Sequence, residues 1–353
     1  MLSSGAGPAL NQFGYCIKIS FCNYVAMSLA GIQGATVFAL CMQVVSNVSI
    51  FICGIVGAMT PIAAFLKGQG DTNGIRILMR TVTKVQLVSN LVLVLILEAF
   101  PQLMLVIYAV DANVVDMAIA GLRIFSVMFV FRGFVLVYMY YFQVIDRAVY
   151  SSILSVIDGF AGLIPITLLL TSIFGISGLW LAYPVLSLLM LVGIAVSNLA
   201  IARASDGRYQ GLLLIEKDDQ ATTTSGLTIP LRAEDAVLGA EDLQSFCLDS
   251  GLGSRVSSIV AMALEEMAVY SLENEHKNDL GQSDVLDVLV KINSNRVIMQ
   301  VRSIGAPFDT TSANEEKFSN IGVLKSISKS VEFGYSLGMN HTTITLARGG
   351  MAD

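Results

Sequence analysis

Four ionisable side chains interrupt long apolar stretches in the first part of this 353-residue chain: Lys18, Arg123, Arg132 and Asp158. A charge inside a run of membrane character is costly, so each is a candidate for a substrate or ion pathway. Asp158 lies in SVIDGFAGLIP, close to two glycines and a proline. A carboxylate there could take up a proton or a cation, or pair with an arginine of the preceding helix. The alternatives are a purely structural ion pair and a residue near the headgroups.

The three basic residues differ in depth. Arg123 and Arg132 are nine residues apart, close to half a turn out of phase at about 3.6 residues per turn, so they cannot both face one narrow seam. Arg132 is nearer the middle of its apolar run and is the better cavity candidate, whereas Arg123 suits an interface. Lys18 either contributes to the pathway or extends its amine along an apolar stem to the membrane surface.

Amide side chains recur at helical spacing. Gln43 and Asn47 are four residues apart, as are Gln86 and Asn90, so each pair lies on one helix face. In lipid such groups need partners or water, so they point into a bundle. Interhelical hydrogen bonds and a polar pathway explain them equally well, and we take Gln43 and Asn47 as lesser pathway contacts.

The elements that carry these residues are long and apolar. Apolar types make up 54% of the chain and charged types 14%, and charges become frequent only beyond about residue 203. A membrane-spanning helix needs about 20 mostly apolar residues. The sequence predicts an α-helical membrane bundle over residues 1–208, with six spans at roughly 12–31, 36–65, 80–101, 114–142, 148–172 and 176–202.

The loop charges predict a topology. One set of loops holds seven basic residues: Lys67, Arg76, Arg80, Lys84, Arg147, Arg203 and Arg208. The opposite set holds almost none, and Asp111 is its clearest charge. The positive-inside rule places the basic set in the cytoplasm. Six spans then put both termini there, in a multi-pass protein of the inner membrane. The formal net charge of −6 argues against nucleic-acid binding.

Beyond the last span the pattern changes to α+β. A linker over residues 209–225 precedes a soluble domain over 226–353. Residues 227–231 are typical of a strand, and 233–252 and 254–275 have the apolar spacing of amphipathic helices. VLDVLVKI and RVIMQVRS flank a short polar turn and predict a hairpin. A helix, IGVLKSISKSV, and a closing strand pair follow. We expect a helical layer on a mixed sheet.

Neither the cysteines nor the histidines predict a metal site. No cysteine pair has zinc or redox spacing, which indicates buried thiols at all five positions: Cys16, Cys22, Cys41, Cys53 and Cys247. His276 and His341 are far apart, without partners at ligand spacing, and we expect both in solvated positions.

Glycine-rich segments punctuate the membrane region. The second span ends in GIVGAMTPIAAFLKGQGDTNG, and FGISGLWLAYPVLSLL opens the sixth. With the long fourth span, these features resemble one lobe of the multidrug and toxic-compound extrusion (MATE) family over about residues 10–203. The resemblance implies a cation- or proton-coupled exporter of organic molecules that works by alternating access. Because that family has two six-helix lobes, it also implies a homodimer, a first lobe missing from this chain, or a lobe that no longer transports.

In the soluble region, ALEEMAVYS, VRSIGAPFD and the closing GMNHTTITL follow one another in an order that resembles the GHKL ATP-binding fold. The similarity is greatest to its anti-sigma-factor serine-kinase branch and covers about residues 225–347. It assigns Glu266 to the family's catalytic glutamate. It assigns Gly305 and Asp309 to the adenine-site turn, and Gly322 to what is left of the phosphate lid.

Two positions depart from that family's pattern. Tyr270 stands where the family has a magnesium-binding Asn, and Ser303 where it has the adenine-binding Asp. A phenol is a poor substitute for a compact oxygen ligand on magnesium. A Ser hydroxyl loses the charge-assisted part of the adenine hydrogen bond. We therefore expect a non-catalytic domain without a cofactor, and keep weak binding of ATP and magnesium as an alternative.

Together these features predict a transporter rather than an enzyme, with Arg132 and Asp158 as cavity groups. The expected partners are the lipid bilayer, a small organic cation or drug-like substrate with H+ or Na+, and a second lobe or a second copy. One alternative is a membrane-anchored signalling protein whose GHKL-like domain binds a cytoplasmic protein. A second is a weak ATP-binding serine kinase or ATPase.

Overall fold

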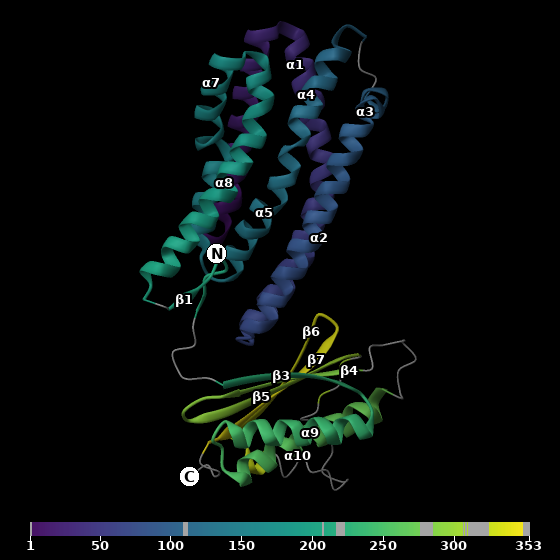
Figure 1. Cartoon of the computed structure of the whole chain (residues 1–353), viewed down its shortest axis with the longest axis vertical. Coiled ribbons are helices and arrows are strands. Elements are labelled where there is room, and N and C mark those ends of the chain that lie inside the picture. The colour runs from purple at the N-terminus through teal and green to yellow at the C-terminus, as the bar shows by residue number, and fades with distance from the viewer. Residues whose placement is uncertain are drawn as a thin grey trace. The chain divides into compact units, whose positions relative to one another are not determined.

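The structure is a computed structural model that describes residues 2–108, 112–206, 208–216, 223–275, 285–305, 307, 309 and 325–348. The chain divides into two compact units, residues 1–216 and 217–353. The first is helical and the second is a sheet with helices against it (Figure 1). Each unit is described by itself.

The helical unit is built from long apolar helices joined by short turns. Its main helices are α1 (Leu2–Gly68), α2 (Thr72–Ala99), α3 (Pro101–Ile107), α4 (Val115–Ser126), α5 (Met128–Val144), α6 (Ala148–Val156), α7 (Leu163–Phe174) and α8 (Ile176–Ala204). Two short helices complete it: η1 (Ala112–Val114) and the π-helix η2 (Ile157–Ala161).

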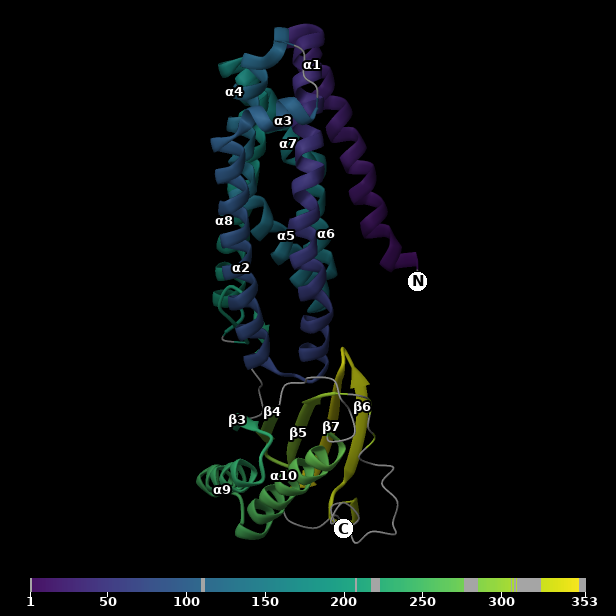
Figure 2. The same cartoon turned by 90° about the vertical axis from the view of Figure 1, so that its right-hand side faces the viewer.

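Helix α1 consists of two arms. Ala30 and Gly31 leave helical geometry, and Gly31 has a φ of 59°, a conformation that suits glycine. The arms meet at this break and run in opposite directions (Figure 2). Among the described residues, five helical stretches are long and apolar enough to cross a membrane, and the first holds both arms, Phe13–Gly68. The two arms correspond to the first two of the six predicted spans.

Three predicted spans differ from the observed helices. Helix α2 begins at Thr72 rather than near residue 80, because Asp71 caps it by accepting a hydrogen bond from the Gly74 backbone N–H at 2.7 Å. The predicted fourth span is two helices, α4 and α5, divided at Val127. The predicted fifth span is α6 and α7 with the π-helix between them.

Close packing joins α8 to its neighbours. The Trp180 ring is buried and stacks on Phe38 of α1, with ring centroids 6.5 Å apart. At Gly178, a β-carbon would lie only 2.2 Å from the Leu170 carbonyl oxygen of α7. Helices α7 and α8 therefore approach each other to a distance that only glycine permits.

Several of the predicted loop cations gather at one end of the helical unit. Lys67 pairs with Asp146, and Arg76 donates to the Gln210 side chain at 3.0 Å. The Arg147 guanidinium lies 4.2 Å from the centre of the Tyr209 ring. The small antiparallel pair of β1 (Tyr209–Gln210) and β2 (Ile215–Glu216) lies at the same end. Clustering of basic residues at one end is the arrangement on which the positive-inside rule depends.

The second unit holds a five-stranded sheet. Its elements are β3 (Thr223–Pro230), α9 (Ala233–Asp249), α10 (Ser254–Glu275), β4 (Val285–Ile292), β5 (Arg296–Ile304), β6 (Ser330–Ser336) and β7 (Met339–Ala347). Helices α9 and α10 pack on one face of the sheet, and the shared core includes Leu264, Val288 and Met299 (Figure 1). The predicted strand, helix pair, hairpin and closing strand pair are all confirmed.

The expectation of a mixed sheet is wrong for the described strands. Their order is β3-β4-β5-β7-β6, and every neighbouring pair is antiparallel. Hairpins connect β4 to β5 and β6 to β7. Two helices that reverse direction connect β3 to β4, and such a connection returns the chain antiparallel. Of the predicted helix at 321–331, residues 321–324 lie outside the described residues and 325–327 are helical. Its last two residues belong to β6 instead, so the predicted helix end is wrong.

The cysteine expectation is also partly wrong. Cys22, Cys41 and Cys247 are buried, but Cys16 and Cys53 are exposed on the outside of the helical unit. Both belong to apolar α1, where the surrounding solvent is lipid, so an apolar residue gains nothing by facing inward. All five are free thiols.

Candidate functional site

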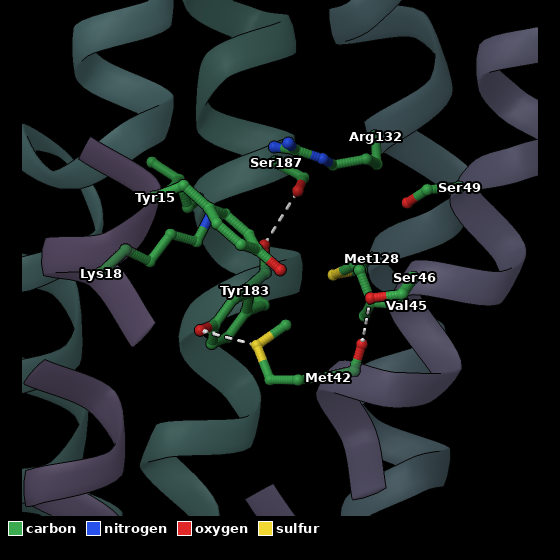
Figure 3. A pocket seen from close by; sticks show the side chains of 11 residues that line it. Tyr15, Lys18, Met42, Val45, Ser46, Ser49, Met128, Arg132, Tyr183 and Ser187 are labelled. Atoms are coloured by element: carbon green, nitrogen blue, oxygen red, sulfur yellow. Dashed lines mark hydrogen bonds between the residues drawn. The ribbon is translucent and has the colours of Figure 1, made fainter. Parts of the chain in front are cut away.

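A cavity of about 350 Å³ lies inside the helical unit, a volume typical of small-molecule sites. Eleven residues from α1, α5 and α8 line it, counting both arms of α1 (Figure 3). They are Tyr15, Lys18, Met42, Val45, Ser46, Ser49, Met128, Arg132, Tyr183, Leu186 and Ser187.

An ion pair joins α5 to the π-helix beside this cavity. The Arg132 guanidinium donates to the Asp158 carboxylate, whose side chain is only 7% exposed. The sequence left this pairing open as one of several roles for Asp158. The structure brings the two cavity candidates into direct contact.

Lys18 approaches the same carboxylate residue from α1. Its ammonium donates to the Asp158 backbone carbonyl at 3.3 Å and lies 5.3 Å from the centre of the Tyr183 ring. Lys18 is only 6% exposed. Of the two expectations for this residue, the cavity position is therefore the observed one, because its amine points inward and not along a lipid-facing stem (Figure 3).

The local backbone explains how Asp158 reaches this position. It lies in the π-helix Ile157–Ala161, whose widened turn accommodates an extra residue and is frequent at functional sites. A β-carbon on Gly14 would lie 3.6 Å from the Gly159 α-carbon and 3.0 Å from the Phe160 ring. Small residues at this crossing let the first arm of α1 approach the π-helix closely, which brings Lys18 to Asp158.

Aromatic, hydroxyl and sulfur groups complete the wall. The Tyr183 hydroxyl donates to the Met42 sulfur at 3.7 Å. Ser46 and Ser187 donate to backbone carbonyls of their own helices, at Met42 and Tyr183. Their hydroxyl protons are thus used locally.

The sequence reasoning missed most of these wall residues, although a signal was present. They recur at helical spacing of three or four, in the pairs Tyr15 and Lys18, Ser46 and Ser49, Met128 and Arg132, and Tyr183 and Ser187. A search for polar or aromatic neighbours one turn from each buried cation would have found Tyr15.

The structure does not bring Gln43 and Asn47 to the cavity. Both side chains are exposed, and Asn47 donates to the Tyr108 hydroxyl. Their neighbours Met42, Val45 and Ser46 face the cavity instead, because each is one or two positions from Gln43 or Asn47, and residues at that spacing point in other directions.

The second amide pair and Arg123 have structural partners. Gln86 donates to Asn90 at 2.7 Å, and Asn90 reaches the Val130 carbonyl of α5 at 3.5 Å. This is the interhelical hydrogen bonding that the spacing left open. Arg123 is half exposed and lies 3.9 Å from Glu98, consistent with an interfacial position.

Three of the four candidates in the C-terminal unit fall among the described residues. Glu266 is half-buried on α10. The Gly305 backbone N–H follows β5 and donates to the Gly338 carbonyl at 3.1 Å. Asp309 is described only as a single position, and Gly322 lies outside the described residues. Among the residues that the structure describes, no cluster of acidic, His or Cys side chains could hold a metal ion.

A polar row crosses the sheet of this unit. Thr228, Asp287, Arg302 and His341 lie opposite one another on four successive strands. Arg302 donates to Asp287 at 3.1 Å, and Thr228 donates to the other oxygen of that carboxylate at 3.2 Å. Partial burial and the Arg302 charge lower the pKa of His341 below its ordinary value.

Comparisons with known proteins match the helical unit. Residues 10–166 match the model of the MatE family. A comparison with curated protein sequences gives no match.

Solved MATE structures are similar to this chain in fold. A MATE in complex with MaL6 is 19% identical, covers 57% of this chain and gives a TM-score of 0.53. The outward-facing and inward-facing conformations of a multidrug resistance MATE family transporter of the MOP superfamily are 20% and 19% identical. They cover 57% and 58% of this chain, with TM-scores of 0.53 and 0.54. The chain spans only 46% to 48% of the length of these three structures.

The match to the MatE family model includes eight of the eleven cavity-lining residues, and the other three lie beyond it on α8. The helical unit is thus similar to that family over residues 10–166 and has the fold of part of a MATE transporter.

Proposed function

We propose that the helical unit is one lobe of a MATE-type transporter that exports small organic, drug-like compounds, driven by H+ or Na+. The observation that carries the proposal is the cavity with a buried lysine, a partly buried arginine and a buried carboxylate beside it, in a unit of MATE fold. Inside a membrane, ionisable groups are retained mainly where they serve a pathway.

A complete transporter would need a second lobe, since the chain spans less than half of the solved structures that it matches. Transporters built from repeats bind their cargo between the repeats. A second copy of this chain or a separate six-helix lobe would supply the other half. We propose an inner-membrane location with both termini in the cytoplasm, supported by the basic cluster at one end of the bundle.

For the C-terminal unit we propose a GHKL-like fold with a non-catalytic regulatory role. The support is the order of strands and helices together with Tyr270 and Ser303 at two ligand positions of that family. A protein-binding signalling module is the second candidate, favoured by the division of the chain into two compact units.

The test is substitution of Asp158 in a transport assay. Ion-driven efflux of a panel of cationic and anionic dyes is measured in proteoliposomes that hold the full chain, alone or with its second lobe. Asp158→Asn should abolish coupling to the ion gradient, because the amide cannot release a proton or bind a cation by charge. Asp206→Asn is the matched control, since Asp206 is exposed just after α8 at a positive φ that Asn tolerates.

Unchanged efflux by the Asp158→Asn variant would show that this carboxylate does not couple transport. Absence of efflux by the wild-type chain in every arrangement would instead favour the signalling role.

A further inference from the structure

The charges around the cavity do not balance. Lys18 and Arg132 line it, and none of its eleven lining residues is acidic. Asp158 is the one carboxylate in contact with these cations among the described residues, and Arg132 already binds it. Two cations against one carboxylate leave the site with a net charge of about +1 when both bases are protonated.

Lys18 carries this excess charge. Its ammonium contacts one backbone carbonyl at 3.3 Å and the face of the Tyr183 ring, and neither is a carboxylate. An ammonium has three protons to donate, so a buried Lys18 has donor capacity to spare. Burial of a cation without a counter-ion is strongly unfavourable, and an anion in the cavity would offset that cost.

The rest of the wall sets the remaining chemistry of a ligand. Met42, Val45, Met128 and Leu186 present apolar surface, and Tyr15 and Tyr183 present aromatic rings. Ser46 and Ser187 direct their hydroxyl protons at backbone carbonyls, so the cationic side chains are the only charged donors in the lining, beside the hydroxyls of Tyr15 and Ser49. The cavity of about 350 Å³ has room for a small molecule.

We infer that the cavity binds a small organic anion, with one carboxylate, sulfonate or phosphate group held by Lys18 beside Arg132 and an apolar or aromatic body against the methionine and tyrosine wall. The inference rests on the proposed function, in that the cavity is taken as the cargo site. It reverses the sign of charge that the sequence led us to expect. An organic cation of the same shape would meet Lys18 without a free carboxylate to accept it.

Binding is tested on the full chain in phosphatidylcholine nanodiscs by equilibrium dialysis, with empty nanodiscs as the blank. The probes are 2-naphthoate and N,N,N-trimethyl-2-naphthylammonium, which share a ring system and differ in charge. Naphthoate should bind saturably and the ammonium should not. Lys18→Gln should weaken naphthoate binding by at least about tenfold, because the charge that holds the anion is removed.

Two variants control for folding and for general charge. Lys18→Arg keeps the cation and should keep saturable binding. Lys84→Gln removes an exposed lysine of α2 and should leave binding unchanged. If Lys18→Gln fails to fold, displacement of naphthoate from the wild-type chain replaces it. Benzoate should then compete, and benzyltrimethylammonium should not.

A second arm distinguishes a free anion from a lipid headgroup. Phosphatidylglycerol mixed into the nanodiscs should weaken naphthoate binding if the headgroup enters the cavity, and should leave it unchanged if the site takes only free organic anions. Both results keep the inferred charge preference. Equal or tighter binding of the ammonium probe, no saturable naphthoate binding, or unchanged affinity in Lys18→Gln would overturn the inference. Since dialysis measures binding alone, these results are independent of whether the chain transports.

Discussion

At the scale of single residues, the pair of Arg132 and Asp158 decides how any variant of the cavity must be interpreted. Removal of one partner from a buried ion pair leaves an uncompensated charge and costs about 3–5 kcal/mol. Loss of efflux in Asp158→Asn therefore has to be accompanied by a measurement of folded protein. Substituting both partners with neutral residues relieves that cost, so the double variant separates stability from coupling.

His341 gives a residue-scale prediction in the C-terminal unit. Its folded-state pKa lies below the ordinary 6.5, through burial first and then through Arg302. The neutral ring is therefore the form that favours folding, since the unfolded chain takes up the proton more readily. This contribution to stability is present above pH 6.5 and is lost as the pH falls through the lowered pKa.

Hydrogen exchange of the full chain checks this expectation. Protection of the β7 amides, corrected for intrinsic exchange rates, should fall between pH 7.5 and about pH 5 in the wild type. The His341→Gln variant, which does not titrate, should lose less protection over the same interval. An equal pH dependence in both proteins would contradict the assignment to His341.

Lys18, Arg132 and Asp158 could be selected as candidates from the sequence because charges are rare in its apolar runs. An ionisable group there is energetically costly and is retained mainly for function. The uncharged wall was not predictable in the same way, since Tyr15, Tyr183 and the serines occur throughout membrane helices. Gln43 and Asn47 show the limit of the polarity argument. Their shared face was correct, but nothing in the spacing says which face of α1 looks inward.

At the scale of elements, the contact between α7 and α8 gives a prediction with an internal control. Gly178→Ala should destabilise the helical unit by about 1–3 kcal/mol, the usual cost of overpacking. The added carbon would clash with the Leu170 backbone, which cannot move aside by a change of side-chain rotamer. Gly193→Ala lies on the same helix with nothing within 4 Å of its added carbon, and should be neutral or slightly stabilising.

Thermal unfolding of both variants in detergent is the measurement. A Gly178→Ala protein as stable as Gly193→Ala would show that the two helices can separate at no cost. It would also remove the structural reason for glycine at position 178.

The number of apolar elements followed from hydropathy, but their irregularities did not. The break at Val127 and the π-helix at 157–161 lie inside continuous apolar runs, where composition is unchanged across the defect. Helix α2 was predicted about eight residues short, because Arg76 and Arg80 lower the local hydropathy although the helix continues through them. The antiparallel order of the sheet depends on the helix pair that connects β3 to β4. The alternation of residues within a single strand does not predict the direction of its neighbours.

At the scale of the whole molecule, we expect the full chain to lack tight nucleotide binding. We expect titration of the full chain with a fluorescent ATP analogue and magnesium to show no saturation below the millimolar range. The reason is that Tyr270 and Ser303 replace the magnesium and adenine ligands of the GHKL family. Micromolar, magnesium-dependent binding would overturn the proposal of a non-catalytic unit.

A paired variant sharpens this titration. Ser303→Asp with Tyr270→Asn restores both ligands of the family's pattern. Gain of nucleotide binding by that double variant would support the GHKL-like assignment, and continued absence would count against it.

The burial of Trp180 supplies an optical probe that needs no label. It is the single tryptophan of the chain, and its ring stacks on Phe38. On α8, Trp180 lies one helical turn before Tyr183. Emission excited at its red edge therefore comes entirely from the helical unit, whatever the C-terminal unit does. Entry of water between α1 and α8 would shift that emission to longer wavelength. Movement of these helices can therefore be followed as a red shift of the emission maximum in the unmodified protein.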